Sequence, residues 1–145
     1  MEPGFFQISL KVFLRRDGAF LVLRDQLTQL GDLPGGRLGQ DELYGTWTEA
    51  VHRELTEELG PDASYLLHPE PLFTFPYYIP SAGTDALGVA YVADYLGGSI
   101  HLSEEHDAAH WVSIDQYDPA DHFSDHIGRA VRRFQRLTAA GTLAL

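Results

Sequence analysis

The sequence predicts a mixed α/β fold in which two helices cover a mostly central β-sheet. Three observations support this prediction: alternating apolar residues near the start, an amphipathic helix pattern over residues 46–59, and a second one over 124–138. Further strands are predicted between the helices, and this order is typical of a sheet with helices packed on it. A chain of 145 residues can bury one core, so we expect a single domain over residues 1–145.

The predicted sheet begins with a hairpin. Apolar residues alternate with other residues over 7–15, namely Ile8, Leu10, Val12 and Leu14. This period of two predicts a strand. Arg16-Asp17-Gly18 is typical of a turn, and residues 20–24 supply the returning strand.

Four more segments are predicted to be extended. They are residues 71–79, 87–96, 99–102 and 110–114. Pro76 lacks a backbone N–H, which places the second half of the first segment at an edge of the sheet. Gly97-Gly98 is expected to turn the chain between the second segment and the third.

The two predicted helices have recognisable starts and apolar faces. In the first, Thr46 is the expected N-cap and Glu49 is expected to complete a capping box, while Gly60-Pro61 ends the helix. The second helix is expected to begin after Ser124. Apolar residues share one face of it: Ile127, Ala130, Val131, Phe134 and Leu137.

The first helix carries three carboxylates within one and a half turns. Glu54, Glu57 and Glu58 are three or four residues apart or adjacent, so their side chains lie close together on the helix surface. Like charges at these spacings destabilise a helix, and Arg53, four residues before Glu57, is expected to neutralise only one of them. A hard divalent cation, which prefers oxygen ligands, would suit the others.

A glycine turn precedes this helix. Gly35 and Gly36, in Leu33-Pro34-Gly35-Gly36, can both take positive φ and bring backbone close to a ligand. The turn and the sequence Arg-Glu-Leu-Thr-Glu-Glu-Leu-Gly at 53–60 together resemble the Nudix box, the signature of the Nudix hydrolase family. That signature reads G, five residues, E, seven residues, R-E, an aliphatic residue, any residue, E-E, any residue, G. Six specified positions match: Arg53, Glu54, Leu55, Glu57, Glu58 and Gly60.

The first half of the signature, which would span residues 36–60, departs from the pattern. Glu42 follows Gly36 at the expected spacing, but ten residues instead of seven then separate it from Arg53. One interpretation is a three-residue insertion between Glu42 and the helix, with Leu43, Tyr44 and Gly45 bulging outward. We expect Gly45 to supply a positive φ there. The other interpretation is that the first glutamate of the signature is lost.

The resemblance implies an α/β/α sandwich and a metal-dependent hydrolase. It implies Mg²⁺, for which Mn²⁺ would substitute, held by Glu54, Glu57 and Glu58. Catalytic residues expected by resemblance are Arg53, Glu57, Glu42 and a base from the acidic segment 103–107, where Glu105 comes first and Glu104 second. Arg53 would orient Glu57, and Gly35 and Gly36 would bring backbone to the cation.

By the same resemblance, the substrate is a nucleoside di- or triphosphate or a nucleoside diphosphate derivative such as ADP-ribose or a nucleotide sugar, cut at its diphosphate linkage. The alternative is a Nudix-fold module that binds nucleotides without cleaving them. Pro76 matches a marker of ADP-ribose-cleaving relatives, and Tyr77 and Tyr78 match a marker of dinucleoside polyphosphate relatives, so these markers do not discriminate. An isoprenoid diphosphate isomerase is excluded because those relatives use a cysteine and this chain has none.

Composition narrows the partners. A net charge of −11 argues against a nucleic-acid polymer, since phosphate backbones are bound by an excess of Lys and Arg. We find no apolar run long enough for a membrane span and no signal-peptide pattern. Without cysteine there is no disulfide, and a cytoplasmic location is expected. A homodimer is left open.

Overall fold

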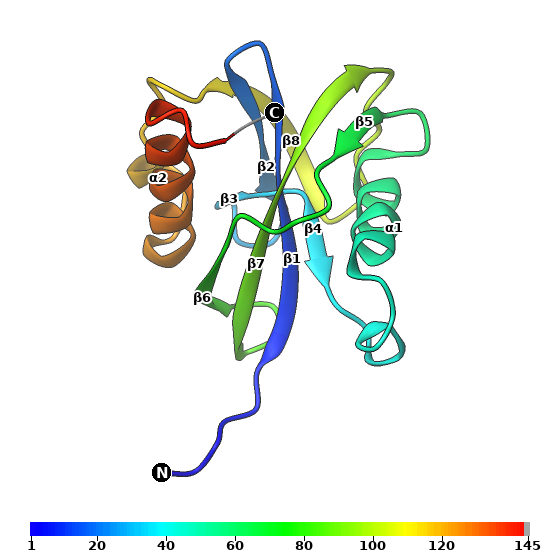
Figure 1. The fold of residues 1–145 in the computed structure, drawn as a ribbon, viewed down its shortest axis with the longest axis vertical. Helices are drawn as coiled ribbons and strands as arrows, with labels where there is room; N and C mark the ends of the chain where they lie inside the picture. Colours follow the sequence, from blue (N-terminus) through cyan, green and yellow to red (C-terminus); the bar gives the residue numbers. More distant parts are fainter. Residues whose placement is uncertain (144–145) are drawn as a thin grey trace.

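The computed structural model describes residues 1–143 and has a central mixed sheet between two helices (Figure 1). The helices are α1 (Trp47–Leu59) and α2 (Asp125–Ala139), with short 3₁₀ turns η1 (Gln40–Glu42) and η2 (Pro119–Asp121). The strands are β1 (Gln7–Arg16), β2 (Ala19–Asp25), β3 (Gly31–Asp32), β4 (Gly35–Arg37), β5 (Ser64–Leu67), β6 (Phe73–Ile79), β7 (Thr84–Gly97) and β8 (His106–Ser113). The predicted α/β/α sandwich is confirmed. Within residues 1–143, no helix is long and apolar enough to cross a membrane.

Strands β1 and β7 form the centre of the sheet. They pair in parallel from Gln7 opposite Ala86 to Arg15 opposite Asp94. On its other edge β7 pairs antiparallel with β6 and then β5, whereas the other edge of β1 is shared by β4 and β2. Strand β2 in turn pairs with β3 and β8. Because β4 and β2 take different parts of β1, the glycine turn lies beside the middle of the sheet.

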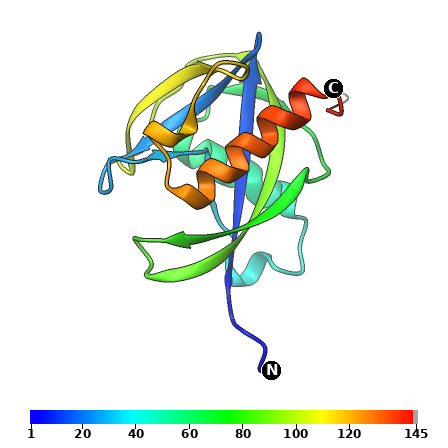
Figure 2. The same cartoon turned by 90° about the vertical axis from the view of Figure 1, so that its left-hand side faces the viewer.

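Each helix buries one apolar face against the sheet. On the α1 side, Val51, Leu55 and Leu59 pack with even-numbered residues of β1 such as Leu10 and Val12. On the α2 side, Val131 and Phe134 pack with Phe13 and Phe20, and the rings of Phe13 and Phe134 stack at 4.1 Å. Figure 2 shows α2 lying across its face of the sheet. Side chains of β1 therefore alternate between two cores, as its sequence period predicts.

Most predicted elements are present, with boundaries shifted by a few residues. The hairpin turn uses Asp17 and Gly18 at φ 51° and 77°. Strand β6 pairs only with β7, so the edge position predicted from Pro76 is confirmed. Strands β3, β4 and β5 were not predicted.

Two predictions are wrong. Residues 99–102 form no strand: the amides of His101 and Ser103 instead bind the carbonyls of Leu59 and Glu58 at the end of α1, at 2.8 and 3.3 Å. These carbonyls have no partner within the helix, so the segment satisfies them. The capping box is also wrong. Thr46 is the N-cap, but its hydroxyl makes no capping bond, and the amide of Glu49 binds the backbone carbonyl of Thr46 at 3.0 Å.

Candidate active site

Helix α1 presents its three glutamates in different environments. Glu58 is buried, Glu54 is half-buried and Glu57 is exposed. The apolar face of the helix fixes this orientation, because Leu55 and Leu59 are anchored in the core between and beside them. The carboxylates of Glu58, Glu54 and Glu57 therefore form a row from the core to the surface, which we call the carboxylate ladder.

Strand β4 brings backbone against this ladder. Gly35 has φ 127°, and a Cβ there would lie 1.9 Å from the carbonyl oxygen of Leu10. Its amide donates to Glu58 Oε1 at 3.2 Å. A Cβ on Gly36 would lie 2.3 Å from Glu54 Oε2. The backbone of Gly36 does not have a positive φ, so the expected positive φ is found only at Gly35. Gly36 is required because any side chain there would collide with Glu54.

Arg53 reaches more carboxylates than the sequence predicts. Its Nη1 lies 3.2 Å from Glu57 Oε1 and 3.1 Å from Glu54 Oε1. Its Nε and Nη2 donate to the two oxygens of Glu42 at 2.9 and 2.6 Å, a bidentate pair. The expectation that Arg53 neutralises one charge only is therefore wrong.

The bidentate pair of Arg53 with Glu42 agrees with a three-residue insertion after Glu42. Glu42 Oε1 also accepts from the amide of Gly39 at 2.7 Å, so its carboxylate is held toward α1. Leu43 and Tyr44 are exposed, as an outward bulge requires. Gly45 does not have a positive φ, which makes that expectation wrong. The bulge is closed instead by Trp47, whose indole N–H donates to the carbonyl of Leu43 at 3.0 Å.

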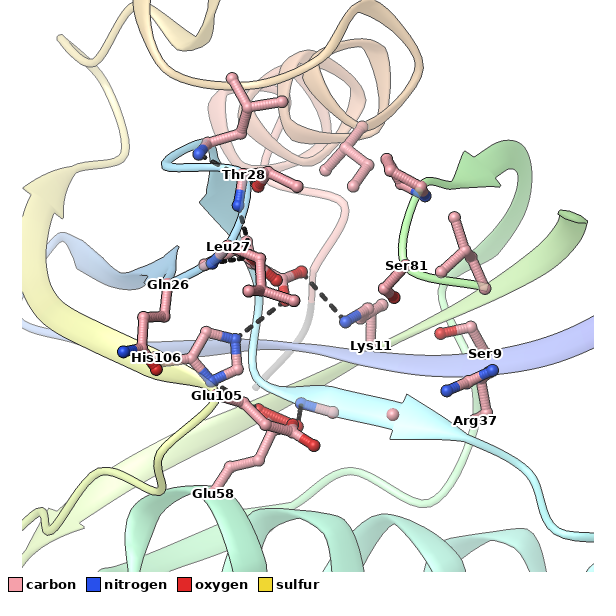
Figure 3. Close-up of a pocket in the computed structure, with 18 of the residues that line it drawn as sticks. Ser9, Lys11, Gln26, Leu27, Thr28, Arg37, Glu58, Ser81, Glu105 and His106 are labelled. Atoms are coloured by element: carbon pink, nitrogen blue, oxygen red, sulfur yellow. Dashed lines mark hydrogen bonds and ion pairs between the residues drawn. The ribbon is translucent and has the colours of Figure 1, made fainter. Parts of the chain in front are cut away.

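Three charged or titratable residues that were not predicted from the sequence lie behind Glu58, namely Lys11, Asp32 and His106. Figure 3 labels Lys11 and His106 together with Glu58. Lys11 Nζ lies 3.0 Å from Asp32 Oδ1, and Asp32 Oδ2 lies 3.0 Å from His106 Nε2. His106 Nδ1 lies 3.5 Å from Glu58 Oε2. These residues come from β1, β3 and β8, so no local spacing connects them. The available signal was Lys11, the one charged residue between Ile8 and Leu14 in the apolar part of the strand.

Burial sets the ionisation of this group. Burial raises the pKa of the Glu58 carboxyl to about 9, opposed by Lys11 and reinforced by Asp32, Glu54 and Glu105. Burial also raises the pKa of Glu54, partly offset by Arg53. For Asp32, burial acts upward, but Lys11 and His106 outweigh it and lower the pKa to about 2. Glu58 and Glu54 thus lack sufficient cationic compensation from protein.

These residues fit a divalent cation. Glu58 Oε2 is buried without a hydrogen-bond partner in the described part of the chain, and Glu54 and Glu57 lie on the same helix. Hard cations such as Mg²⁺ use one or two carboxylates, backbone carbonyls and several waters. Within residues 1–143 no three His, Asp or Glu side chains converge as a complete cage. The carboxylates therefore suit a cation that also keeps water or substrate oxygens.

A cavity of about 1050 Å³ opens beside the ladder. Glu54, Glu57 and Glu58 line one side of it. Glu104 and Glu105 also line it, because the segment tied to the end of α1 leads directly into them.

The opposite wall of the cavity comes from β6 and α2. It includes Tyr77, Tyr78, Ile79 and Ile127. Tyr77 is buried and donates to Ser9 Oγ at 2.6 Å, which agrees with packing, whereas Tyr78 is half exposed. The cavity is therefore acidic on one side and partly apolar on the other.

Comparison with known proteins defines the class. The NUDIX domain family matches residues 6–134, nearly the whole chain. The chain therefore belongs to the Nudix hydrolase family, and the resemblance noted from the box is confirmed. No protein with a curated description matches the sequence significantly.

Solved structures agree on the fold. A MutT protein from Methanosarcina mazei Go1 superposes with a TM-score of 0.77 at 24% identity, covering 92% of this chain and 95% of that one. A candidate asymmetric diadenosine tetraphosphate hydrolase from Jonesia denitrificans gives 0.72 at 18% identity, covering 97% and 98%. A UDP-X diphosphatase gives 0.70 at 16% identity, covering 99% of this chain and 68% of that one.

Proposed function

We propose that this Nudix hydrolase uses Mg²⁺, or Mn²⁺ in its place, to cleave the diphosphate linkage of a nucleotide. The observation that supports it most is the ladder of Glu54, Glu57 and Glu58 facing a cavity of about 1050 Å³. A bound cation would neutralise the diphosphate and polarise its phosphoryl oxygens. Glu58 and Glu54 would hold it from the inner side, and Glu57 from the solvent side.

Other residues would position these ligands. Arg53 ties Glu42, Glu54 and Glu57 together, so it would keep their carboxylates from turning toward solvent. Gly35 and Gly36 would let backbone reach the cation, since a larger residue at either position would collide with neighbouring atoms. These roles agree with the first interpretation of the insertion, in which Glu42 keeps its place in the box.

Glu105 is the proposed base for the attacking water, with Glu104 second. Both line the cavity, and Glu105 lies close enough to Glu58 to contribute to the raised pKa of that carboxyl. The carbonyl of Glu105 accepts from the amide of Gln26 at 2.9 Å, which anchors the backbone of Glu105. A general base must reach the water that it activates, and an anchored backbone limits the search of its side chain.

The substrate class that we propose is a nucleoside di- or triphosphate, ADP-ribose or a nucleotide sugar. The apolar wall with Tyr78 and Ile127 would receive a base or sugar, while the acidic side takes the diphosphate through the cation. A net charge of −11 disfavours nucleic-acid polymers, so we propose free nucleotides in the cytoplasm as the partners. Two structural neighbours carry the names of a UDP-X diphosphatase and a candidate diadenosine tetraphosphate hydrolase, which guides the choice of compounds.

A compound screen tests the proposal. Nucleoside di- and triphosphates, ADP-ribose, nucleotide sugars and dinucleoside polyphosphates are incubated with the protein and Mg²⁺, and products are separated by chromatography. We expect turnover of at least one compound, its loss in excess chelator and its return with Mg²⁺ or Mn²⁺. Turnover that persists in chelator would contradict the metal requirement. Tight binding of a nucleotide without turnover would favour the non-catalytic alternative.

A further inference from the structure

Glu58 is the buried carboxylate of the ladder, and both of its oxygens face other protein groups. Oε1 accepts from the amide of Gly35 at 3.2 Å, and Oε2 lies 3.5 Å from His106 Nδ1. The side chains of Glu58 and His106 are each only 3% exposed. The environment of this carboxylate is therefore built by the fold and not by solvent.

The ring of His106 is held from its far side. Nε2 lies 3.0 Å from Asp32 Oδ2, and an ionised carboxylate can only accept, so Nε2 carries a hydrogen and donates it. Asp32 is fixed in turn by Lys11, which binds its other oxygen at 3.0 Å. This chain of contacts leaves the ring little freedom and directs Nδ1 at Glu58.

Nδ1 has no other task in the described structure. Among residues 1–143, His106 Nδ1 and Glu58 Oε2 are both buried side-chain atoms without a hydrogen-bond partner. Leaving such atoms unpaired is costly, so their position side by side calls for an explanation. Groups behind a metal ligand commonly fix its orientation, and their loss typically weakens metal binding by about 10- to 100-fold.

The two groups that face Glu58, the amide of Gly35 and the ring of His106, are both linked to Lys11. Lys11 reaches His106 through Asp32, and it also donates to the carbonyl of Leu33 at 3.3 Å. Leu33 leads into Gly35, which pairs with Lys11 between β4 and β1. Lys11 therefore steadies both the amide at Oε1 and the imidazole at Oε2.

We propose that His106 is a positioning residue that donates from both ring nitrogens: Nδ1–H holds the Glu58 carboxylate for the divalent cation, and Nε2–H binds Asp32, which Lys11 fixes. The inference rests on the proposed function, because it assumes that Glu58 binds the cation. It adds three residues outside the Nudix box to the machinery. His106 touches neither substrate nor cation in this role, and its effect passes through Glu58.

Three substitutions at position 106 separate the two contacts of the ring. Asn places a polar atom near the position of Nδ1, so His106→Asn keeps a partner for Glu58. Gln extends to the position of Nε2, so His106→Gln keeps a partner for Asp32 only. His106→Phe keeps the ring and loses both. The matched control is His110→Asn on the same strand, where the histidine is exposed.

The readout is Mn²⁺ binding to the protein without substrate, measured by electron paramagnetic resonance, together with kcat and KM. We expect His106→Phe and His106→Gln to weaken Mn²⁺ binding at least about tenfold. His106→Asn and His110→Asn should stay within about threefold of the natural protein. We expect kcat to fall with Mn²⁺ affinity, while KM at saturating Mn²⁺ changes little.

Thermal unfolding identifies variants that fail to fold. If His106→Phe is one of them, the Mn²⁺ affinities of His106→Gln and His106→Asn decide whether the proposal holds. Natural Mn²⁺ affinity in His106→Gln would overturn the proposal, and so would an equal loss in His106→Asn and His106→Gln. If the natural protein binds no Mn²⁺ and cleaves no nucleotide, the proposed function itself fails. That result is distinct from a natural protein that is active and indifferent to position 106.

Discussion

Two similar groups of side chains are centred on Lys11 and Arg15, which lie four residues apart on the same face of β1. In one, Asp32 joins Lys11 and His106, with both contacts at 3.0 Å. In the other, Asp94 joins Arg15 at 2.8 Å and His68 at 3.0 Å. Each is a cation, an aspartate and a histidine, and we call them the inner and the outer triad.

The triads differ in burial and in what lies beyond the histidine. His106 is 3% exposed and Asp32 19%, whereas His68 is 24% exposed and Asp94 32%. The inner triad continues to Glu58 and the cavity. Exposed ion pairs contribute about 0–1 kcal/mol, while loss of one partner of a buried pair costs about 3–5 kcal/mol. The same three kinds of residue therefore have a structural role near the end of β1 and a place beside the candidate active site at the middle of the strand.

The largest expected difference between the inner and the outer triad is in catalytic activity. Glu58→Gln should lower kcat about a thousandfold, roughly 4 kcal/mol of transition-state stabilisation, because the amide is a poor ligand for a hard cation. Asp94→Asn should leave kcat within about twofold. Steady-state kinetics at saturating Mg²⁺ measures both. Comparable losses in the two variants would remove the distinction between the triads.

Removing the cation of each triad should separate them in stability. Lys11→Met removes the lysine from the largely buried Asp32 and leaves it only the contact to His106, so the free energy of unfolding should fall by about 3–5 kcal/mol. Arg15→Met breaks a more exposed pair and should cost about 1 kcal/mol. Urea denaturation of the two variants measures the difference. An equal cost would mean that burial does not distinguish the triads.

Acid should weaken the inner triad through Asp32. Its pKa is lowered to about 2 from an ordinary value of 3.8, so its contribution to stability is complete above about pH 5 and is lost as the pH falls toward 2. The shift corresponds to about 2 kcal/mol. Between pH 5 and pH 2, the natural protein should therefore lose about that much more unfolding free energy than Asp32→Asn. Parallel pH profiles from urea denaturation would contradict the lowered pKa.

The smallest effects are expected at the surface, where Glu42 and Arg53 form an ion pair outside the two triads. Glu42→Ala should lower kcat about tenfold, because Arg53 loses the bidentate contact that orients it. Deleting residues 43–45 should change kcat by less than about threefold, since this bulge lies outside the contact. The two variants are compared by kcat and by circular dichroism. A deletion more harmful than Glu42→Ala would assign the role to the bulge.

The sequence predicted the elements that are long enough to show a period. Strands β1 and β7 and helix α2 are examples, because a buried face repeats several times in each. Strands β3, β4 and β5 have two to four residues, too few for a pattern. The strand expected over 99–102 was wrong because the unpaired carbonyls at the end of α1 take the amides of that segment.

The same distinction applies to the site. Helix geometry was sufficient to bring Glu54, Glu57 and Glu58 together, and one of the two interpretations of the box kept Glu42 in its role. The inner triad could not be predicted, because its members lie on three strands and meet only after the sheet has formed. Their residue types also have ordinary explanations in isolation, such as a lysine on a strand or a histidine in an acidic loop.

The parallel pairing of β1 with β7 has a consequence for the order of synthesis. Arg15 and Asp94 are 79 residues apart in sequence, so β1 lacks its central neighbour until β7 has left the ribosome. Pairings of this separation form late and slowly. Strands β2 and β4 and helix α1 precede β7 and can already pair or pack with β1. The edge of β1 that β7 will occupy stays open until then, and an unpaired edge exposes the nascent chain to aggregation. The strand that carries Lys11 to the candidate active site thus waits for a central partner that is made much later in the chain.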